Sequence, residues 1–237
     1  MDELTAQNPN SIQQMFGSIA AKYDLINSVL SLGIHHYWKK RLIDQSEAKT
    51  GDSILDCATG TGDLAFLFES KLKKTGKVIG TDFCEPMLKV AQEKARQKGS
   101  LVQFETADVL NLPYLDSQFA VASISFGIRN VKNPRQALTE LGRVVKSGGR
   151  VLVLEFGQPR SRLLGPLYRF YATRILPKVG GWISGQPKAY SYLESSSARF
   201  PSGQEFLELA KSTHHFSKVR MIPFFTGIAY LYVLERR

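Results

Sequence analysis

The chain has 237 residues, of which 43% are hydrophobic and 11% aromatic. This length can bury a sizeable core in a single domain, and no apolar run reaches the length of a membrane span. The only two cysteines, Cys57 and Cys84, have neither the spacing of a disulfide framework nor that of a metal site. These features argue against a disulfide-rich secreted scaffold and against an integral membrane protein.

The four histidines come as two adjacent pairs, His35–His36 and His214–His215. We expect neighbouring side chains to diverge on a helix, and therefore predict no metal site. The N-terminus, MDELTAQNPN, lacks the basic start and apolar run of a signal peptide and is too acidic for a transit peptide. We predict a cytoplasmic protein, with attachment to the inner face of the cytoplasmic membrane left open.

The formal net charge of +10 is high for this length. A basic chain attracts nucleic acid, anionic lipid or acidic substrates, and the charge alone does not choose among them. The excess is concentrated, because seven basic residues and a single acid, Glu194, lie between Arg160 and Arg199.

Hydrophobic periodicity predicts a helical region at 11–48, followed by strands and helices in alternation. Asn133 is the predicted N-cap of one of these helices. The segment 158–200 breaks the alternation. The predicted strands are 53–58, 76–83, 101–108, 119–126, 148–156, 216–222 and 228–237, and the helices among them are 63–74, 86–98, 133–146 and 202–213.

Strands that alternate with helices pair in parallel in a doubly wound sheet. We therefore predict an α/β fold of the Rossmann-like type, with a seven-stranded, mostly parallel sheet and helices on both faces. A single domain is expected to span 1–237. It would carry an N-terminal helical cap at 1–50 and a basic, aromatic insertion at 158–200.

The stretch ILDCATGTGDLAF (54–66) joins the first predicted strand to a helix. Gly60, Gly62 and Ala65 satisfy the dinucleotide-binding fingerprint, and Asp82 follows at the distance of a ribose-binding acid. This signal is weak by itself, because Asp82 suits the ribose of a dinucleotide and that of an adenosine ligand equally well.

Two further carboxylates near this loop favour a ligand without phosphate. A dinucleotide places its pyrophosphate on the helix N-terminus, where Asp63 would occupy the N–H donors and repel it. Asp56, at the end of the first strand, adds negative charge to the same crevice. S-adenosylmethionine has a sulfonium, an ammonium and a ribose diol but no phosphate, so we predict it as the cofactor. In the alternative interpretation Asp63 only caps the helix.

Asp108 follows the third predicted strand, where its side chain could bind the adenine amino group while the Val109 N–H meets a ring nitrogen. Asp108 could also be an ordinary turn residue. However, Asp56, Asp82 and Asp108 stand at the ends of three successive predicted strands, and three turn residues are unlikely to fall there by chance. Ligands of such sheets bind beyond the carboxyl ends of the strands.

Three other stretches are typical of one enzyme family: YDLINSVLSLGIHHYW (23–38), ISFGIRNV (124–131) and RVVKSGGRVLVLEF (143–156). With them, the chain resembles almost end to end the quinone-biosynthesis C-methyltransferases of the UbiE/MenG type, which are class I S-adenosylmethionine-dependent methyltransferases. Four mild departures from the family pattern bear only on which quinol is preferred: Ile26, His36, Ser147 and Gly157.

This resemblance implies C-methylation of a demethylated isoprenoid quinol, either demethylmenaquinol or 2-methoxy-6-polyprenyl-benzoquinol. It implies cofactor contacts at Thr61, Asp82, Asp108, Val109 and Ser125. The first four are also indicated by the sequence patterns described above. Ser125 is implied by the resemblance alone, and its hydroxyl could instead form a local hydrogen bond within the strand.

Methylation of a ring carbon needs a deprotonated neighbouring hydroxyl and an in-line approach to the methyl group. Arg129 and Asn130 lie just beyond the fourth strand, where Arg129 would stabilise the phenolate and Asn130 would orient the ring oxygens. Arg129 could instead be a surface residue. His35 is a candidate base, although paired histidines on a helix are more often core or surface residues.

A polyisoprenoid substrate gives the insertion at 158–200 a role, because arginines among Leu, Phe and Tyr suit an anionic membrane surface or a lid over the site. A nucleic-acid methyltransferase and a non-catalytic adenosyl-binding module are the alternatives. Amino-methylating enzymes usually carry Asp/Asn-Pro-Pro-aromatic where this chain has SFGIRN, so we predict no nucleic-acid partner. A homodimer is left open.

Overall fold

The computed structural model describes residues 9–159, 165–166, 170–175, 192, 196–197 and 199–237. Seven strands form one sheet in the order β3-β2-β1-β4-β5-β7-β6, which confirms the predicted fold class. The strands are β1 Ser53–Cys57, β2 Lys77–Asp82, β3 Gln103–Thr106, β4 Phe119–Ser125, β5 Val145–Phe156, β6 Phe216–Phe224 and β7 Ala229–Arg236.

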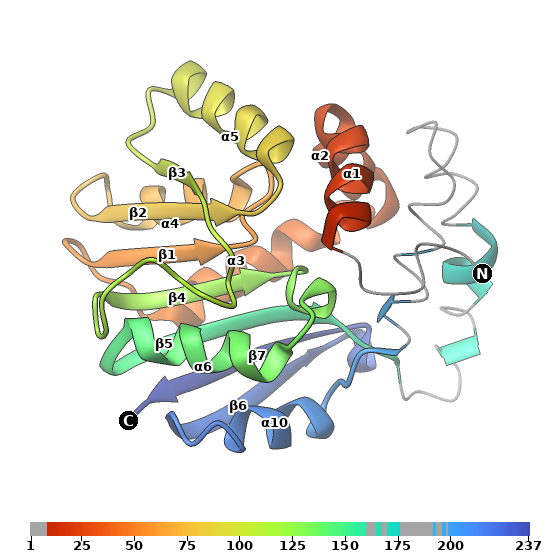
Figure 1. The fold of residues 1–237 in the computed structure, drawn as a ribbon. Coiled ribbons are helices and arrows are strands. Elements are labelled where there is room, and N and C mark those ends of the chain that lie inside the picture. The colour runs from red at the N-terminus through yellow and green to blue at the C-terminus, as the bar shows by residue number, and fades with distance from the viewer. Residues whose placement is uncertain (1–8, 160–164, 167–169, 176–191, 193–195, 198) are drawn as a thin grey trace.

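Strands β1 to β5 pair in parallel, and β7 runs antiparallel to both β5 and β6. The strand order reverses between β1 and β4, because the chain first proceeds outward to β3 and then returns. This reversal opens a crevice beyond the carboxyl ends of the strands, where ligands of such sheets bind. In Figure 1 the arrowheads of β1, β2 and β4 point toward α1 and α2, beyond that edge.

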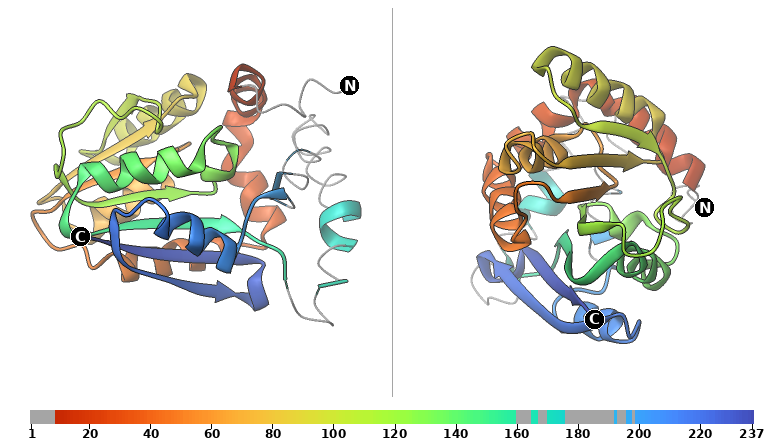
Figure 2. Two further views of the ribbon diagram at one scale, coloured as in Figure 1. Left: turned by 60° about the horizontal axis from the view of Figure 1, so that its bottom comes forward. Right: turned by 90° about the vertical axis from the view of Figure 1, so that its left-hand side faces the viewer.

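The central strands β1 and β4 are mostly apolar and are buried along nearly their whole length, so both faces of the sheet are covered. Helices α3 (Ile34–Ser46) and α4 (Asp63–Lys71) pack on one face, and α6 (Pro134–Val144) and α10 (Gln204–Lys211) pack on the other. The views in Figure 2 show the two layers, with α5 (Glu85–Lys98) beside β2 and β3. The predicted N-cap is confirmed, because Asn133 Oδ1 accepts from the Gln136 N–H at 3.1 Å.

The helical region predicted at 11–48 is interrupted twice. Helix α1 (Pro9–Ile19) is followed by a 3-10 turn at Ala20–Lys22 and by α2 (Tyr23–Leu30). A second break precedes α3, where Leu32 and Gly33 have φ of 49° and 75°. The chain therefore turns instead of continuing as one rod, and α1 and α2 lie over the carboxyl edge of the sheet (Figure 1).

Most of the insertion predicted at 158–200 lies outside the described residues, including Leu163, Leu164 and Leu167. A π-helical turn at Tyr171–Ile175 is described, and the Tyr171 hydroxyl donates a hydrogen bond to the Leu30 carbonyl oxygen. This contact brings the turn beside the end of α2. Among the described residues, no helix combines the length and the apolar character that crossing a bilayer requires.

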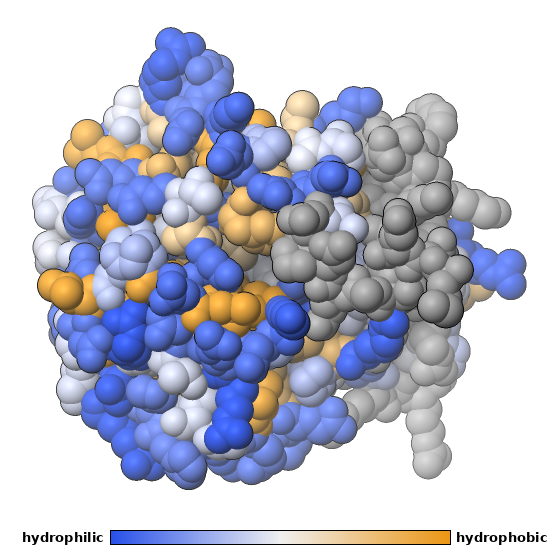
Figure 3. Space-filling view, viewed as in Figure 1, coloured by the Kyte–Doolittle hydropathy of each residue, from blue (hydrophilic) through white to orange (hydrophobic). Residues whose placement is uncertain are grey.

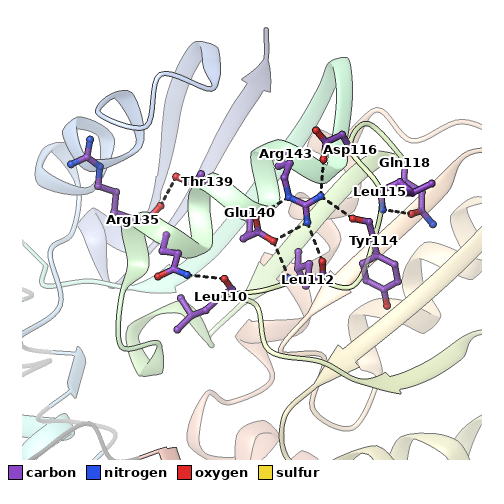
Figure 4. A network of polar contacts seen from close by, with 11 residues as sticks. Leu110, Leu112, Tyr114, Leu115, Asp116, Gln118, Arg135, Thr139, Glu140 and Arg143 are labelled. Carbon is purple, nitrogen blue, oxygen red and sulfur yellow. Dashed lines mark hydrogen bonds and ion pairs between the residues drawn. The ribbon is translucent and has the colours of Figure 1, made fainter.

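Three side chains of α6, those of Gln136, Glu140 and Arg143, fasten the segment between β3 and β4, and Arg143 makes the most contacts. Its guanidinium donates to the carbonyl oxygens of Leu112 and Tyr114 at 3.0 and 2.8 Å, and it pairs with Asp116 and Glu140 at 2.8 Å each. Figure 4 shows these contacts converging on the guanidinium. The segment therefore has a fixed path although it is neither helix nor strand.

Candidate active site

Two adjoining cavities open beyond the carboxyl ends of the strands, with volumes of about 350 and 500 Å³. We call them the first and the second cavity. Five residues line both of them: Tyr23, Ala58, Gly60, Ser125 and Phe126. The cavities are therefore two halves of one cleft that meet at the glycine loop and the end of β4.

Asp82, Asp108 and Val109 all line the second cavity, as their strand-end positions predict. Asp82 is buried, and its two carboxylate oxygens accept the N–H groups of Gly60 and Cys84 at 2.8 and 2.9 Å. Burial raises its pKa despite these hydrogen bonds. A carboxylate has lone pairs beyond these two, so Asp82 can still accept the hydroxyls of a ribose.

Asp108 has both of the roles considered for it. It is exposed and lines the second cavity, and its Oδ1 also accepts the Leu110 N–H at 2.9 Å, which is the bond of a turn residue. The turn bond uses one oxygen and leaves the other for a ligand.

The two loop glycines have different functions. Gly60 has φ of 58°, and a Cβ there would meet only Tyr23 at 3.8 Å, so the space beside it belongs to the cleft. Gly62 has φ of 86° and lines neither cavity; its Cβ would lie 2.7 Å from Phe104 Cζ. The prediction of Gly62 as a cofactor contact is thus not supported, because close packing against Phe104 explains this glycine.

Thr61 lines the first cavity, as expected for a residue of the glycine loop. Its hydroxyl donates to Asp24 Oδ1 at 2.5 Å, and the other oxygen of Asp24 pairs with Lys94. The glycine loop is therefore tied to both α2 and α5.

The carboxylate of Asp63 is neutralised, which corrects the electrostatic argument made from the sequence. Its oxygens lie 3.4 Å from Lys39 Nζ and 3.0 Å from Lys94 Nζ, and its side chain makes no capping bond. Burial opposes its ionisation, but the two lysines outweigh burial and lower its pKa. Asp63 is thus neither a helix cap nor a source of net negative charge.

Asp56 is the acid of the first cavity that keeps no cation partner among the described residues. It is buried, and it accepts hydrogen bonds from Ser123 and Thr59 at 2.7 Å each. Burial raises its pKa to about 6. The negative charge predicted for the crevice therefore comes from Asp82, Asp108 and Asp56, and not from Asp63.

Aromatic rings form much of the wall of the first cavity. The rings of Phe126 and Phe156 lie 4.5 Å apart between centroids, and Trp38 meets Phe156 edge-on at 6.1 Å. Phe225 lies 6.4 Å from Trp38 on the other side. A wall of this kind favours a flat, apolar ligand such as an aromatic ring.

Arg129 also lines the first cavity, and its side chain is only 2% exposed, so it is not a surface residue. Its guanidinium donates to Glu155 at 2.5 Å and to the Phe126 carbonyl oxygen at 2.7 Å, and lies 5.5 Å from the centre of the Phe156 ring. The sequence interpretation missed Glu155, which is fully buried. A single acid at the end of the apolar run RVLVLEF was the signal that could have revealed it.

Asn130 lies on the other side of the cleft from Arg129, since it lines the second cavity only. Its Oδ1 accepts a hydrogen bond from the Tyr192 hydroxyl at 3.1 Å. The structure thus separates two neighbouring residues that the sequence interpretation had placed together on the substrate.

His35 is buried in the wall of the first cavity, and its tautomer follows from its neighbours. The Ser31 hydroxyl lies 2.6 Å from both the Asn27 carbonyl oxygen and His35 Nδ1. Because the carbonyl can only accept, the single hydroxyl proton goes to Asn27, and Nδ1–H must donate to Ser31. Nε2 then carries the free lone pair.

Burial, assisted by Lys39 and His36, lowers the pKa of His35 to about 4, so the imidazole is neutral at pH 7. The expected divergence of the His35 and His36 rings is wrong, because their centroids lie 3.9 Å apart. No cluster of metal-binding side chains occurs in the part of the chain that the structure describes.

Unpartnered polar atoms concentrate at this cleft. Among the described residues, four buried side-chain atoms have no hydrogen-bond partner, and three of them belong to the wall of the first cavity: Trp38 Nε1, Ser125 Oγ and Arg129 Nε. Buried polar groups are nearly always hydrogen-bonded in folded proteins. Trp38 Nε1 and Arg129 Nε can only donate, so the oxygen atoms of a ligand are the kind of partner that suits them.

The sequence profile described as the ubiE/COQ5 methyltransferase family matches residues 4–233. The chain belongs to this family. Membership confirms the predicted methyltransferase, with S-adenosylmethionine as the methyl donor.

Two relatives of this member of the UbiE/COQ5 family illustrate the similarity. The ubiquinone/menaquinone biosynthesis C-methyltransferase UbiE of Bdellovibrio bacteriovorus is 53% identical over 225 residues, covering 95% of both chains. The demethylmenaquinone methyltransferase of Thermus thermophilus is 40% identical over 222 residues, covering 94% of this chain and all of that one.

Solved structures agree in fold. A SAM-dependent methyltransferase from Aquifex aeolicus matches with a TM-score of 0.61 at 18% identity, over 84% of this chain and 89% of that one. Phosphoethanolamine N-methyltransferase 2 of Haemonchus contortus, in complex with S-adenosylmethionine, matches with a TM-score of 0.59 at 19% identity, over 79% of this chain and 38% of that one.

Proposed function

We propose that this chain methylates a ring carbon of a demethylated isoprenoid quinol, either demethylmenaquinol or 2-methoxy-6-polyprenyl-benzoquinol, in quinone biosynthesis. The observation that carries the proposal is the first cavity, where aromatic walls surround three unpartnered polar atoms. A quinol ring has a flat apolar body and two oxygens, so it matches both features. The names of the relatives point to the same substrate class.

The residues present fit S-adenosylmethionine. The open space at Gly60 admits a ligand, the unpartnered Ser125 hydroxyl lies where the cavities meet, and Asp82 can accept ribose hydroxyls. Asp108 and Val109 would hold the adenine, while Thr61 and Asp56 would border the amino-acid end. When bound, the cofactor supplies a methyl group on a positively charged sulfur.

The quinol would be activated in the first cavity. His35 Nε2 would accept the proton of the ring hydroxyl, and Arg129 would hold the resulting phenolate oxygen. With that oxygen deprotonated, the adjacent ring carbon would be the nucleophile that takes the methyl group of the bound donor. Its displaced proton would pass to water and His35 would return its own proton to the ring oxygen, so that one proton is released for each methyl group transferred. Asn130 would orient the ring oxygens from the second cavity, on the cofactor side of the cleft.

The broader organisation is part of the same proposal. Residues 1–50 and 158–200 would be the cap and the insertion of one domain that spans 1–237. The insertion would contact the anionic inner face of the cytoplasmic membrane as a peripheral attachment, since its basic and aromatic composition suits that surface. Assembly as a homodimer stays a prediction.

The test uses purified protein and S-adenosylmethionine with a labelled methyl group. We expect label in a chemically reduced, short-tailed demethylated naphthoquinol, and none in RNA. A salt-sensitive complex with RNA together with no quinol turnover would instead favour a nucleic-acid methyltransferase.

Alanine at position 60 is expected to weaken binding of S-adenosylhomocysteine, the demethylated cofactor, by roughly tenfold or more, because its methyl group enters the cleft and its left-handed backbone costs about 1–2 kcal/mol. Calorimetric titration measures this. Gly99→Ala is the matched control, since Gly99 has φ of 55° but lines neither cavity. The control should lose stability and keep its affinity. If Gly60→Ala and Gly99→Ala bind S-adenosylhomocysteine equally tightly, Gly60 does not contact the cofactor.

Replacing Arg143 by alanine should loosen the segment that carries Asp108 and Val109. Hydrogen bonds to charged groups contribute roughly 1.5–3 kcal/mol each, so we expect a lower melting temperature and a several-fold loss of S-adenosylhomocysteine affinity. Arg96→Ala removes an exposed ion pair with Glu93 and should change neither quantity. Unchanged affinity in Arg143→Ala would mean that the adenine contacts do not depend on this attachment.

A further inference from the structure

Most of the exposed large hydrophobic side chains belong to segments that also contribute residues to the wall of the first cavity. Among the described residues, ten large hydrophobic side chains are exposed, and three of them, Leu67, Leu101 and Leu115, belong to other parts of the fold. The remaining seven come from α2, the turn between α2 and α3, α3 itself, the π-helical turn with the residue before it, and the 3-10 turn Phe225–Gly227: Leu25, Val29, Leu32, Tyr37, Phe170, Ile175 and Phe225. By contrast, the described surface in Figure 3 is mostly hydrophilic, with hydrophobic residues in small patches.

Leu32 and Phe225 stand out in this group because each both lines the first cavity and faces solvent, at 83% and 51% exposure. They come from distant parts of the chain, Leu32 from the turn between α2 and α3 and Phe225 from the turn between β6 and β7. They therefore form part of the cavity's outer edge, which we call the rim.

The rim residues also have unfavourable backbone conformations. Leu32 has φ of 49° and Phe225 has φ of 45°, a region that bulky side chains rarely adopt. Neither the exposure nor the backbone geometry favours folding. Phe225 gains a ring contact with Trp38, but fold stability does not explain Leu32, which is 83% exposed. Outliers of this kind, at the edge of a binding cavity, point to a role in binding.

Positive charge is concentrated in two stretches of the sequence, one that contains Leu32 and one that contains Tyr171. The stretch between Asp24 and Asp44 and the stretch between Glu155 and Glu194 contain nine basic residues and no acid, against a net charge of +10 for the whole chain. The hydrogen bond from Tyr171 to Leu30 joins these two stretches. Apolar side chains among basic residues complement an anionic lipid bilayer, which offers an apolar interior beneath a negative surface.

We propose that Leu32 and Phe225 are a membrane portal: they insert into the surface of an anionic bilayer, so that the first cavity opens directly onto lipid. A polyisoprenoid quinol could then move its ring into the cavity while its tail stays in the membrane. This inference rests on the proposed function for the identity of the substrate, but membrane insertion of the rim can be measured without any substrate.

The test is cosedimentation with vesicles of phosphatidylcholine and phosphatidylglycerol. The rim variant carries Leu32→Asn and Phe225→Asn, because asparagine tolerates positive φ and removes only the apolar groups. The matched control carries Leu101→Asn and Leu115→Asn, two leucines that are 67% and 79% exposed and line neither cavity. We expect the rim variant to bind vesicles roughly tenfold or more weakly than the wild type, and the control to bind like the wild type.

Three results would overturn the portal: wild-type protein that binds no anionic vesicles, a rim variant that binds them as tightly as the wild type, or a control that loses as much binding. A wild-type dimer that the rim substitutions convert to a monomer, with no vesicle binding, would assign the rim to a second copy of the chain. Unchanged S-adenosylhomocysteine affinity verifies that each variant is folded. Failure to methylate a water-soluble, short-tailed quinol would count against the proposed function and leave the portal result standing.

Discussion

Alanine at position 129 is expected to abolish quinol methylation. The guanidinium is buried against the fully buried carboxylate of Glu155, so removing Arg129 takes away the group proposed to hold the phenolate and leaves a buried charge without its partner. Breaking a buried pair in this way costs about 3–5 kcal/mol of folding free energy. Chemical denaturation measures that loss, and a labelled-methyl assay measures turnover.

The double variant Arg129→Met, Glu155→Gln separates catalysis from folding. It removes both charges at similar volume, and glutamine keeps an oxygen for the N–H of Phe156, which the Glu155 carboxylate now accepts at 2.8 Å. We expect most of the lost stability to return while turnover stays absent. Turnover that recovers with the stability would show that Arg129 serves the fold and does not act on the substrate.

Glutamine in place of His35 is expected to lower kcat roughly 10²–10⁴-fold, the usual contribution of a general base, with unchanged affinity for S-adenosylhomocysteine. The physical reason is the tautomer: Nδ1–H is held by Ser31, so Nε2 is free to take a proton. His36→Gln is the matched control, since His36 is exposed and lines neither cavity. An equal loss in both variants would contradict the assignment.

The pH dependence provides a second test of His35. Because the pKa of His35 is lowered to about 4, kcat measured at saturating S-adenosylmethionine should stay level as the pH falls from 7 to 5 and drop only below that. Saturation is needed because Asp56, with a pKa of about 6, is protonated in this range and would weaken donor binding. Lys39 helps to lower this pKa, so Lys39→Met should move the acid limb to higher pH. The same lowered pKa affects folding. Between about pH 6.5 and pH 4 the imidazole of His35 is protonated in the unfolded chain but not in the folded one, so the free energy of unfolding decreases as the pH falls through this range. If Lys39→Met does not shift the acid limb of the pH–rate profile, that limb reports the titration of a group other than His35.

The sheet and half of the site could be predicted from the sequence because both depend on local patterns. Short apolar runs separated by amphipathic stretches define a doubly wound sheet, and the carboxyl ends of its strands meet at one edge. Asp82, Asp108 and Val109 therefore line one cavity, as expected. Asn133 before Pro134 was likewise sufficient to predict the start of α6.

The remaining features depend on contacts between distant parts of the chain. Asp63 is neutralised by lysines 24 residues before and 31 residues after it, and periodicity gives no sign of either pair. The break at Leu32 does not disturb the helical spacing of apolar residues before and after it, so the sequence predicted one continuous helical region at 11–48. Trp38 was overlooked for a different reason: an aromatic residue at helical spacing looks like core, and only the structure reveals its unpartnered N–H in a cavity wall.

The destination of the methyl group distinguishes methylation of a ring carbon from methylation of a quinol oxygen. Protein would be supplied with S-adenosylmethionine bearing a trideuterated methyl group and with reduced, short-tailed demethylated naphthoquinol, and the product would be analysed by mass spectrometry and proton NMR. We predict the label on the ring carbon beside a hydroxyl, with the proton signal of that carbon lost. Label on a quinol oxygen, or an unlabelled quinol beside a working methyl donor, would contradict it.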